Sequence, residues 1–238
     1  MGDFFVSAQD LVPLTGTAHW PQVVDVRRRA AYEVASGMLP ACVWRDHRAL
    51  ANWAPSLCPD RPVVVYCLHG EQVSQSAVAL LRARGLPARA LRGGIDGWVA
   101  AGGVLRRRGD TPMAPLVLPL RPGAAEIAGA WLWRRFADPD ARFLHVEAAQ
   151  VGAVAAELSL AETPPYEALH DQLFLAAGSA LPPTRLLAGG AGAGLHLRGL
   201  LEAAYLSARR EDEALETAFA IIDAVLAQGR AMRSEDAA

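Results

Sequence analysis

Short apolar runs alternate with helix-like patterns through residues 5–105, the first part of the chain. The clearest run is Pro62–Tyr66, where three valines and a tyrosine, all strong β formers, stand together. The other runs that predict buried strands are 23–26, 39–43 and 88–91. Helical patterns are predicted at 7–14, 27–35, 47–54, 74–84 and 98–101. This alternation of strand and helix is typical of an α/β domain with a parallel or mostly parallel sheet.

The pattern changes after Gly103. Residues 106–124 carry four prolines and no periodicity, which predicts a linker. Beyond it the chain is rich in alanine and leucine, with one strand candidate at 143–146. Helices are predicted there at 125–136, 150–160, 195–209 and 212–227. We therefore predict an α/β domain at residues 1–105 and a mostly α-helical domain at residues 125–238.

Charge and hydropathy narrow the classes of partner. The 238 residues carry a formal net charge of −2, and the basic run Arg106–Arg108 is too short for a nucleic-acid or anionic-membrane surface. No stretch approaches the roughly 18 apolar residues of a membrane span. The N-terminus holds an early acid and no long apolar run, unlike a signal peptide. We expect a soluble cytoplasmic protein that binds neither nucleic acid nor membrane.

The three cysteines are Cys42, Cys58 and Cys67, which is an odd number and too few for a disulfide framework. Cys67 stands where the clearest predicted strand ends, so its thiol lies at the carboxyl edge of the sheet, where ligand sites of open α/β sheets occur. Cys42 and Cys58 are expected to be packing residues or exposed thiols rather than resolving cysteines.

The segment after Cys67 must turn and lead into a helix. Gly70 permits the backbone angles of a tight turn, and a turn wrapped around the sulfur points several backbone N–H groups at it. With the positive end of a helix that begins near Val73, these groups favour the thiolate and also hold an anionic persulfide. This chemistry needs no metal or cofactor. The alternative for a cysteine at a strand end is inert packing.

Three segments match rhodanese domains in order and spacing: VVDVR at 23–27, VVVYCLHGEQVS at 63–74 and LRGGIDGW at 91–98. The chain over about residues 5–105 resembles the small single-domain sulfurtransferases of that family, which use a six-residue loop starting with the cysteine. The resemblance implies that Cys67 is the nucleophile that accepts sulfur. It also implies that the loop binds substrate, with the amides of 68–72 around the persulfide. The implied substrate-binding residues are Leu68, His69, Gly70, Glu71, Gln72 and Val73.

Two further matches to this family imply structural roles near the site. Asp25 and Arg27 match its Asp-x-Arg segment. The other match is its G-G-x-x-x-W turn, formed here by Gly93, Gly94 and Trp98.

The loop departs from a thiosulfate site at Glu71. A carboxylate beside the sulfur opposes the thiolate and repels thiosulfate, which is a dianion; His69 offsets part of this when protonated. A persulfide on a protein or small thiol is therefore expected as the donor at least as much as thiosulfate. Cysteine phosphatases, which are relatives of rhodanese, need an arginine where Val73 stands and usually have a histidine at the place of Tyr66, so phosphatase activity is not expected.

Residues 134–167 resemble the start of a chromate-resistance-type C-terminal domain. The matching pieces are RFADPDARF at 135–143 and TPPYE at 163–167. The resemblance implies a chromate- or oxidant-resistance context. The family's next segment holds a cysteine-containing cluster suited to metal or anion chemistry, of which this chain keeps only His170-Asp171. We therefore predict no metal site. The alternative is convergence on a metal of His145, Glu147, His170 and His196, which as isolated residues are more often surface or core.

The remaining features of the second domain favour structural roles. The glycine-rich segment 188–199 fits neither G-x-G-x-x-G nor a Walker sequence and is expected to be a flexible loop. The last two helices are expected to form a helical core through Leu200, Leu201, Ala204, Leu215, Phe219, Ile222 and Leu226. A face left unsatisfied would instead form a homodimer.

These patterns favour an enzyme over a binding module. The expected function is sulfur transfer through a persulfide on Cys67, with a small-molecule or protein thiol or persulfide as partner and with no cofactor. The alternative is a non-catalytic rhodanese scaffold, or a redox or metalloid sensor in oxidant or chromate resistance, in which Glu71 prevents turnover.

Overall fold

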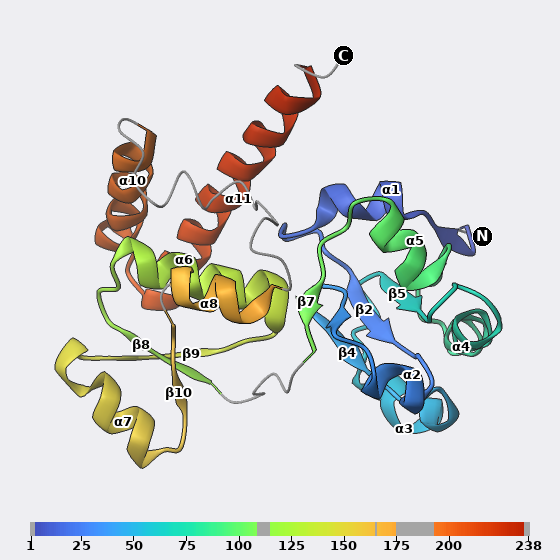
Figure 1. The fold of residues 1–238 in the computed structure, drawn as a ribbon. Helices are drawn as coiled ribbons and strands as arrows, with labels where there is room; N and C mark the ends of the chain where they lie inside the picture. The colour runs from blue at the N-terminus through green and yellow to red at the C-terminus, as the bar shows by residue number, and fades with distance from the viewer. Residues whose placement is uncertain (1–2, 109–114, 165, 175–192, 236–238) are drawn as a thin grey trace. The chain divides into compact units, whose positions relative to one another are not determined.

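The computed structural model of the chain describes residues 3–108, 115–164, 166–174 and 193–235 (Figure 1). Proximity of Cα atoms divides the chain into two compact units. The first takes the described residues up to 108 together with Arg135–Ala137, and the second takes the rest.

The first unit is built on a five-stranded sheet in the order β1-β6-β5-β2-β4, with every pair parallel. Its strands are β1 Phe5–Val6, β2 Gln22–Asp25, β4 Cys42–Trp44, β5 Val63–Tyr66 and β6 Ala88–Leu91. The central strand β5 is buried along its whole length, as its unbroken apolar run requires. The predicted α/β domain with a mostly parallel sheet is therefore confirmed.

Helices cover both faces of this sheet (Figure 1). On one face, α1 Ala8–Leu11 and α5 Gly94–Ala100 pack against a core that includes Val64 and Tyr66. On the other face, α3 Leu50–Trp53 and α4 Gln72–Arg82 pack against Val63, Val65 and Cys67. Successive residues of a strand point to opposite faces, so Tyr66 and Cys67 serve different cores. The short helix α2 spans Arg29–Glu33, and 3₁₀ turns occupy Val12–Leu14, His47–Ala49 and Ala54–Ser56.

The segment predicted as a linker, 106–124, contains two strands, and that part of the prediction was wrong. Strand β7, Arg106–Arg107, pairs antiparallel with β3, Gly37–Met38, inside the first unit. Strand β8, Leu116–Pro119, has its three apolar residues fully buried. The apolar run of β8 is too short to show a periodicity in the sequence. Its prolines stand at the two ends of the strand, where they remove no hydrogen bond from the middle of the sheet.

The second unit combines helices with a small parallel sheet of order β10-β8-β9. Strand β9 spans Phe143–Val146, as predicted, and β10 is the two-residue Ala161–Glu162. The helices of this unit are α6 Ala124–Leu132, α7 Val151–Glu157, α8 Tyr166–Leu173, α10 Ala193–Ser207 and α11 Glu211–Glu235, and a 3₁₀ turn, Ala148–Gln150, precedes α7. A π-helical turn, Trp133–Ala137, follows α6, and its last three residues, Arg135–Ala137, are those that belong to the first unit. The expectation that the C-terminal region is mostly helical is confirmed, although its sheet was not predicted.

Helices α10 and α11 form part of a buried core, as expected. Of the seven predicted core residues, six are at most 6% exposed, but Leu200 is 53% exposed and was wrongly assigned to the core. It directly precedes the fully buried Leu201, and adjacent residues of a helix do not share a face. Most of the predicted glycine-rich loop, up to residue 192, lies outside the described residues. Among the helices that the structure describes, none is long and apolar enough to cross a membrane.

Candidate functional site

Cys67 directly follows the last residue of β5 at the carboxyl edge of the sheet. Its side chain is on the α4 face and the residue is 7% exposed. Helix α4 begins at Gln72, so the loop proper is Leu68–Glu71. Gln72, predicted as a loop residue, and Val73, predicted as a substrate-binding residue near the helix start, form the first turn of the helix, and Val73 packs against the core. The eleven-residue helix thus directs its positive end toward the loop that carries the thiol.

The carbonyl groups of Cys67 and of Leu68, the first loop residue, are bound by the start of α5. The oxygen of Cys67 accepts a hydrogen bond from the N–H of Ile95 at 3.0 Å, and that of Leu68 accepts one from Asp96 at 3.3 Å. Because the C=O and the following N–H of a trans peptide point in opposite directions, the amides of Leu68 and His69 point away from α5.

The last two carbonyl groups of the loop are bound by α4. The oxygen of Gly70 accepts a hydrogen bond from the side-chain amide of Gln75 at 3.1 Å. The oxygen of Glu71 accepts from the N–H of Gln75 at 3.0 Å and from the hydroxyl of Ser74 at 3.1 Å. These bonds fix the peptide planes on both sides of Glu71.

The backbone amides of the loop, in contrast, are open. Within the part of the chain that the structure describes, no hydrogen bond is made by the N–H groups of Leu68, His69, Gly70, Glu71 or Gln72. Consecutive free amides in a turn before a helix form a concave site for an anion. The loop therefore has the donors that a thiolate or a persulfide anion at Cys67 would need.

Two glycines let the loop pack backbone to backbone against the turn before α5. Gly70 has φ +72° and Gly94 has φ +58°, both in the left-handed region. A Cβ on Gly70 would stand 2.5 Å from the oxygen of Leu91 and 2.6 Å from the nitrogen of Gly94. A Cβ on Gly94 would overlap the oxygen of Cys67. The close approach therefore requires glycine at both positions.

The rim of the site is exposed and mainly acidic. The Nδ1 atom of His69 lies 2.7 Å from a carboxylate oxygen of Asp96, with 60% and 58% of the two side chains exposed. Glu71 is exposed and carries the second carboxylate of the rim. Leu68 is 39% exposed and presents an apolar surface beside these charges. We expected His69 to offset the negative charge of Glu71. In the structure, His69 is instead paired with Asp96.

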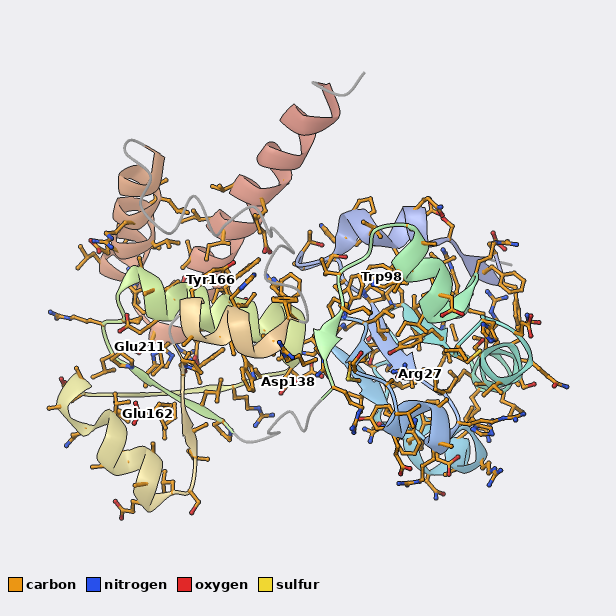
Figure 2. The ribbon with its side chains drawn as sticks, viewed as in Figure 1. Arg27, Trp98, Asp138, Glu162, Tyr166 and Glu211 are labelled. Atoms are coloured by element: carbon orange, nitrogen blue, oxygen red, sulfur yellow. The ribbon has the colours of Figure 1, made fainter. Side chains whose placement is uncertain are left out.

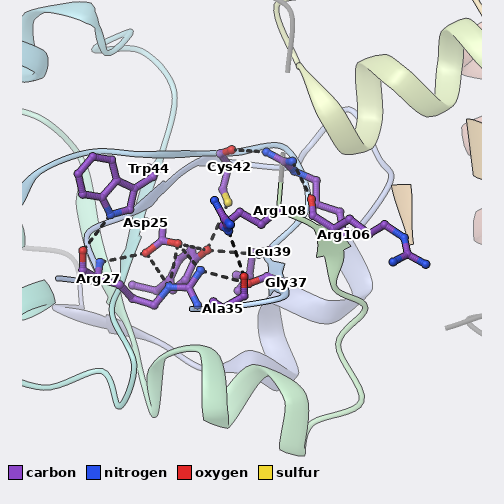
Figure 3. A network of polar contacts seen from close by, with 11 residues as sticks. Asp25, Arg27, Ala35, Gly37, Leu39, Cys42, Trp44, Arg106 and Arg108 are labelled. Atoms are coloured by element: carbon purple, nitrogen blue, oxygen red, sulfur yellow. Dashed lines mark hydrogen bonds and ion pairs between the residues drawn. The ribbon is translucent and has the colours of Figure 1, made fainter. Parts of the chain in front are cut away.

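Asp25 and Arg27 belong to a buried network of polar contacts (Figure 3). The network includes Tyr66, whose side chain is on the face of the sheet opposite Cys67. Nε and Nη2 of Arg27 donate to the same carboxylate oxygen of Asp25 at 2.9 and 2.6 Å, and the hydroxyl of Tyr66 donates to it at 2.9 Å. Tyr66 also lies 3.3 Å from the sulfur of Cys42. Burial raises the pKa of the Cys42 thiol to about 12. This network joins the strands β2, β5 and β4 through the side chains of Asp25, Tyr66 and Cys42. Arg27 and Trp98 are both buried in the interior of the first unit (Figure 2).

Neither of the other cysteines is placed to react with Cys67. Cys42 is 1% exposed and belongs to the core on the other face of the sheet. The backbone of Cys58 is bound by the side chain of Gln22 at 2.8 and 2.9 Å. Gln22 opens β2, so Cys58 lies at the amino edge, and at about 3.3 Å per residue a four-residue strand separates it from Cys67 by roughly 13 Å.

The described residues among the alternative metal ligands, His145, Glu147 and His170, form no metal-binding group. Among the described residues, no group of three or more His, Cys, Asp or Glu side chains is positioned to hold a metal ion. Burial lowers the pKa of His145, whose nearest acidic partner is Asp212 at 3.9 Å. His170 is buried against aromatic rings, and Glu147 is exposed. The side chain of His196 lies outside the described residues.

The first unit has the sheet and the cysteine loop that its sequence motifs led us to expect. A family model of rhodanese-like domains matches residues 7–101. These residues form a rhodanese-like domain. The match ends before β7, and the resemblance of residues 134–167 to chromate-resistance proteins stays a prediction.

Solved structures align with this rhodanese-like domain. A rhodanese-related protein from Thermoplasma volcanium is 25% identical, with a TM-score of 0.38, and the alignment covers 43% of this chain and 97% of that one. A rhodanese-like domain protein from Staphylococcus aureus is 23% identical over 40% of this chain and 91% of that one, with a TM-score of 0.37. A Rhodopseudomonas palustris protein of unknown function, described as a possible tyrosine phosphatase, is 27% identical over 42% and 83%, with a TM-score of 0.35. No curated protein matches the chain.

Sequence reasoning missed two residues of α4 that contact the loop of the rhodanese-like domain. The hydroxyl of Ser74 lies 3.3 Å from the sulfur of Cys67, and Gln75 binds the oxygen of Gly70. Both stand in the first turns of a helix that starts at the loop, where side chains lean back toward the helix N-terminus. If the helix had been predicted to start at Gln72, the contacts of Ser74 and Gln75 with the loop could have been expected.

Proposed function

We propose that the chain is a sulfurtransferase in which Cys67 carries the transferred sulfur as a persulfide. The observation that carries this proposal is the set of open amides of the Cys67 loop at the N-terminus of α4. Such a site stabilises the thiolate that attacks the donor and the persulfide anion that results. The rhodanese-like fold supports the same chemistry.

Sulfur transfer then takes two displacements. The thiolate of Cys67 attacks the terminal sulfur of a donor persulfide R–S–SH, forming a bond to the sulfane sulfur while the donor S–S bond breaks and R–S⁻ leaves. The enzyme now holds Cys67–S–SH, which ionises in the loop. An acceptor thiolate attacks the terminal sulfur, and Cys67 leaves as the thiolate. No oxidant, reductant or metal enters either step.

The acceptor belongs to another molecule. Cys42 and Cys58 are the other cysteines of the chain, and neither is placed to attack a sulfur on Cys67. The persulfide is therefore discharged to an external small-molecule or protein thiol, rather than to a disulfide within the domain.

The sulfur-carrying role predicts a specific change in mass. Incubation of the purified chain with a low-molecular-weight persulfide is expected to add about 32 Da, the mass of one sulfur atom, because the thiolate accepts the sulfane sulfur. Intact-mass spectrometry measures the adduct, and cyanide or excess thiol should remove it. The matched control is Cys67→Ser, which should gain no sulfur.

An adduct that persists in Cys67→Ser would place the sulfur on Cys58 or Cys42 and contradict the proposal. Absence of any adduct in the wild type, with persulfide and with thiosulfate, would favour the alternative of a non-catalytic scaffold or a redox sensor.

The acidic rim predicts a dependence on the charge of the donor. Replacing Glu71 with lysine is expected to increase the rate of sulfur uptake from thiosulfate on the order of tenfold at low ionic strength, because it replaces repulsion of a dianion by attraction. The gain should shrink as salt is added, since both charges are solvent-exposed. Stopped-flow uptake measured across ionic strengths checks both statements.

Asp60→Lys is the matched control for this charge change. Asp60 is exposed and precedes β5 at the amino edge of the same domain, away from Cys67. An equal gain in both variants, or no gain in Glu71→Lys, would show that the rim does not select against thiosulfate.

A further inference from the structure

Ser74 is the one side chain with a hydrogen-bond contact to the sulfur of Cys67 among the described residues. Its hydroxyl oxygen lies 3.3 Å from Sγ, and the residue is fully buried. It occupies the third position of α4, one turn after the loop. The hydroxyl therefore faces the reacting atom from the helix side.

A hydroxyl carries one proton, so its two contacts compete for it. The Ser74 hydroxyl lies 3.1 Å from the oxygen of Glu71, to which it donates while Cys67 is a thiol and supplies the S–H proton. A thiolate has no proton to give and needs donors. Rotation of the hydroxyl toward the sulfur leaves the oxygen of Glu71 bound to the N–H of Gln75 at 3.0 Å, so no buried acceptor is orphaned.

The other polar groups of the loop are engaged elsewhere. His69 is paired with Asp96 at the exposed rim. The hydroxyl of Tyr66 is on the opposite face of the sheet, bound to Asp25. Glu71 is an acceptor and opposes the thiolate. Ser74 is therefore the side-chain donor that already lies within hydrogen-bond distance of the sulfur, beside the backbone amides of the loop.

We propose that Ser74 is a catalytic hydrogen-bond donor that switches from the oxygen of Glu71 to the sulfur when Cys67 becomes a thiolate. This inference rests on the proposed sulfur transfer for its functional meaning. It assigns Ser74 a part in both displacements, because the same thiolate attacks the donor in the first and leaves in the second. A hydrogen bond donated to the departing sulfur stabilises its negative charge and makes Cys67 a better leaving group when the acceptor takes the sulfur.

The test is the pH dependence of Cys67 reactivity toward a neutral disulfide, 4,4′-dithiodipyridine. Ser74→Ala should raise the apparent pKa of Cys67 by about one unit, the effect expected for loss of one hydrogen bond to a charged group. Because nucleophilicity rises with thiol pKa with a coefficient of about 0.4–0.5, the rate should fall about threefold below both pKa values and rise about threefold above them. The two profiles should therefore cross.

Two controls make the comparison specific. Ser76→Ala removes an exposed hydroxyl from the same helix and should leave the profile unchanged. Every variant carries Cys58→Ser, because Cys58, which is half-buried whereas Cys42 and Cys67 are buried, would also react with the reagent. The unfolding midpoint of Ser74→Ala should stay close to that of its parent, since alanine fits the space and favours the helix.

Coincident profiles for Ser74→Ala and its parent would overturn the inference. A rate lowered equally at every pH would also overturn it, because that result indicates a displaced loop rather than a lost donor. Sulfur uptake is measured separately by intact mass. Crossing profiles without uptake would contradict the proposed function and leave the role of Ser74 at the thiolate intact, whereas uptake with coincident profiles would do the reverse.

Discussion

Replacing Arg27 with alanine is expected to lower the free energy of unfolding of the rhodanese-like domain by about 3–5 kcal/mol, the usual result of removing one partner of a buried ion pair. Arg27 is 2% exposed and Asp25 is fully buried, so the carboxylate would lose its cation without gaining water. The hydroxyl of Tyr66 would remain as its side-chain donor. Much of the lost free energy comes from leaving the carboxylate of Asp25 buried in an apolar core without a cation.

Hydrogen exchange of the β5 amides measures this loss in the domain concerned, because β5 is central and fully buried. Arg29→Ala is the matched control: its pair with Glu33 is 3.4 Å long and more than half exposed, so it should change stability by less than about 1 kcal/mol. The double variant Asp25→Ala with Arg27→Ala should be less destabilised than the sum of the single variants. Equal losses for Arg27→Ala and Arg29→Ala would contradict a structural role for the buried pair.

Much of the rhodanese-like domain could be predicted from the sequence because its signals are local. The run at 63–66 is apolar throughout, which a central strand buried on both faces requires. Strand β6 falls at Ala88–Leu91, as its pattern predicts, and Ser7 caps α1 by accepting from the N–H of Asp10. The position of Cys67 at the carboxyl edge follows from these local signals alone.

What the sequence could not show depends on contacts between distant residues. Tyr66 joins Asp25 and Cys42 across 41 and 24 positions of the chain, and no local pattern marks such a network. Strand β8 pairs with β9 and β10, which begin 27 and 45 residues later in the chain. Its own sequence does not show these partners, so the segment was predicted to be a linker. The contact of Ser74 with Cys67 was missed because the predicted helix began two residues too late, at residue 74 instead of Gln72. The prediction therefore made Ser74 the first residue of the helix, whereas it is the third.

Replacing Gly94 with alanine is expected to disable the Cys67 loop. The new Cβ would overlap the oxygen of Cys67 and stand 2.5 Å from the nitrogen of Gly70, and backbone atoms cannot rotate away as a side chain can. The loop must therefore move by a sizeable fraction of an ångström. A displacement near 1 Å costs on the order of 10²-fold in rate when it misplaces reacting groups, so sulfur uptake from a persulfide should fall by about that factor.

Gly85→Ala separates this steric effect from backbone strain. Gly85 has φ +83°, so alanine there is strained like alanine at Gly94, yet nothing stands within 4 Å of its Cβ position. It should cost about 1–2 kcal/mol of stability and leave sulfur uptake unchanged. Single-turnover uptake by intact mass, with unfolding midpoints measured in parallel, gives both quantities. If Gly94→Ala kept the wild-type rate, the loop would not depend on the backbone contact with the turn before α5, and the open amides around Cys67 would lose their structural basis.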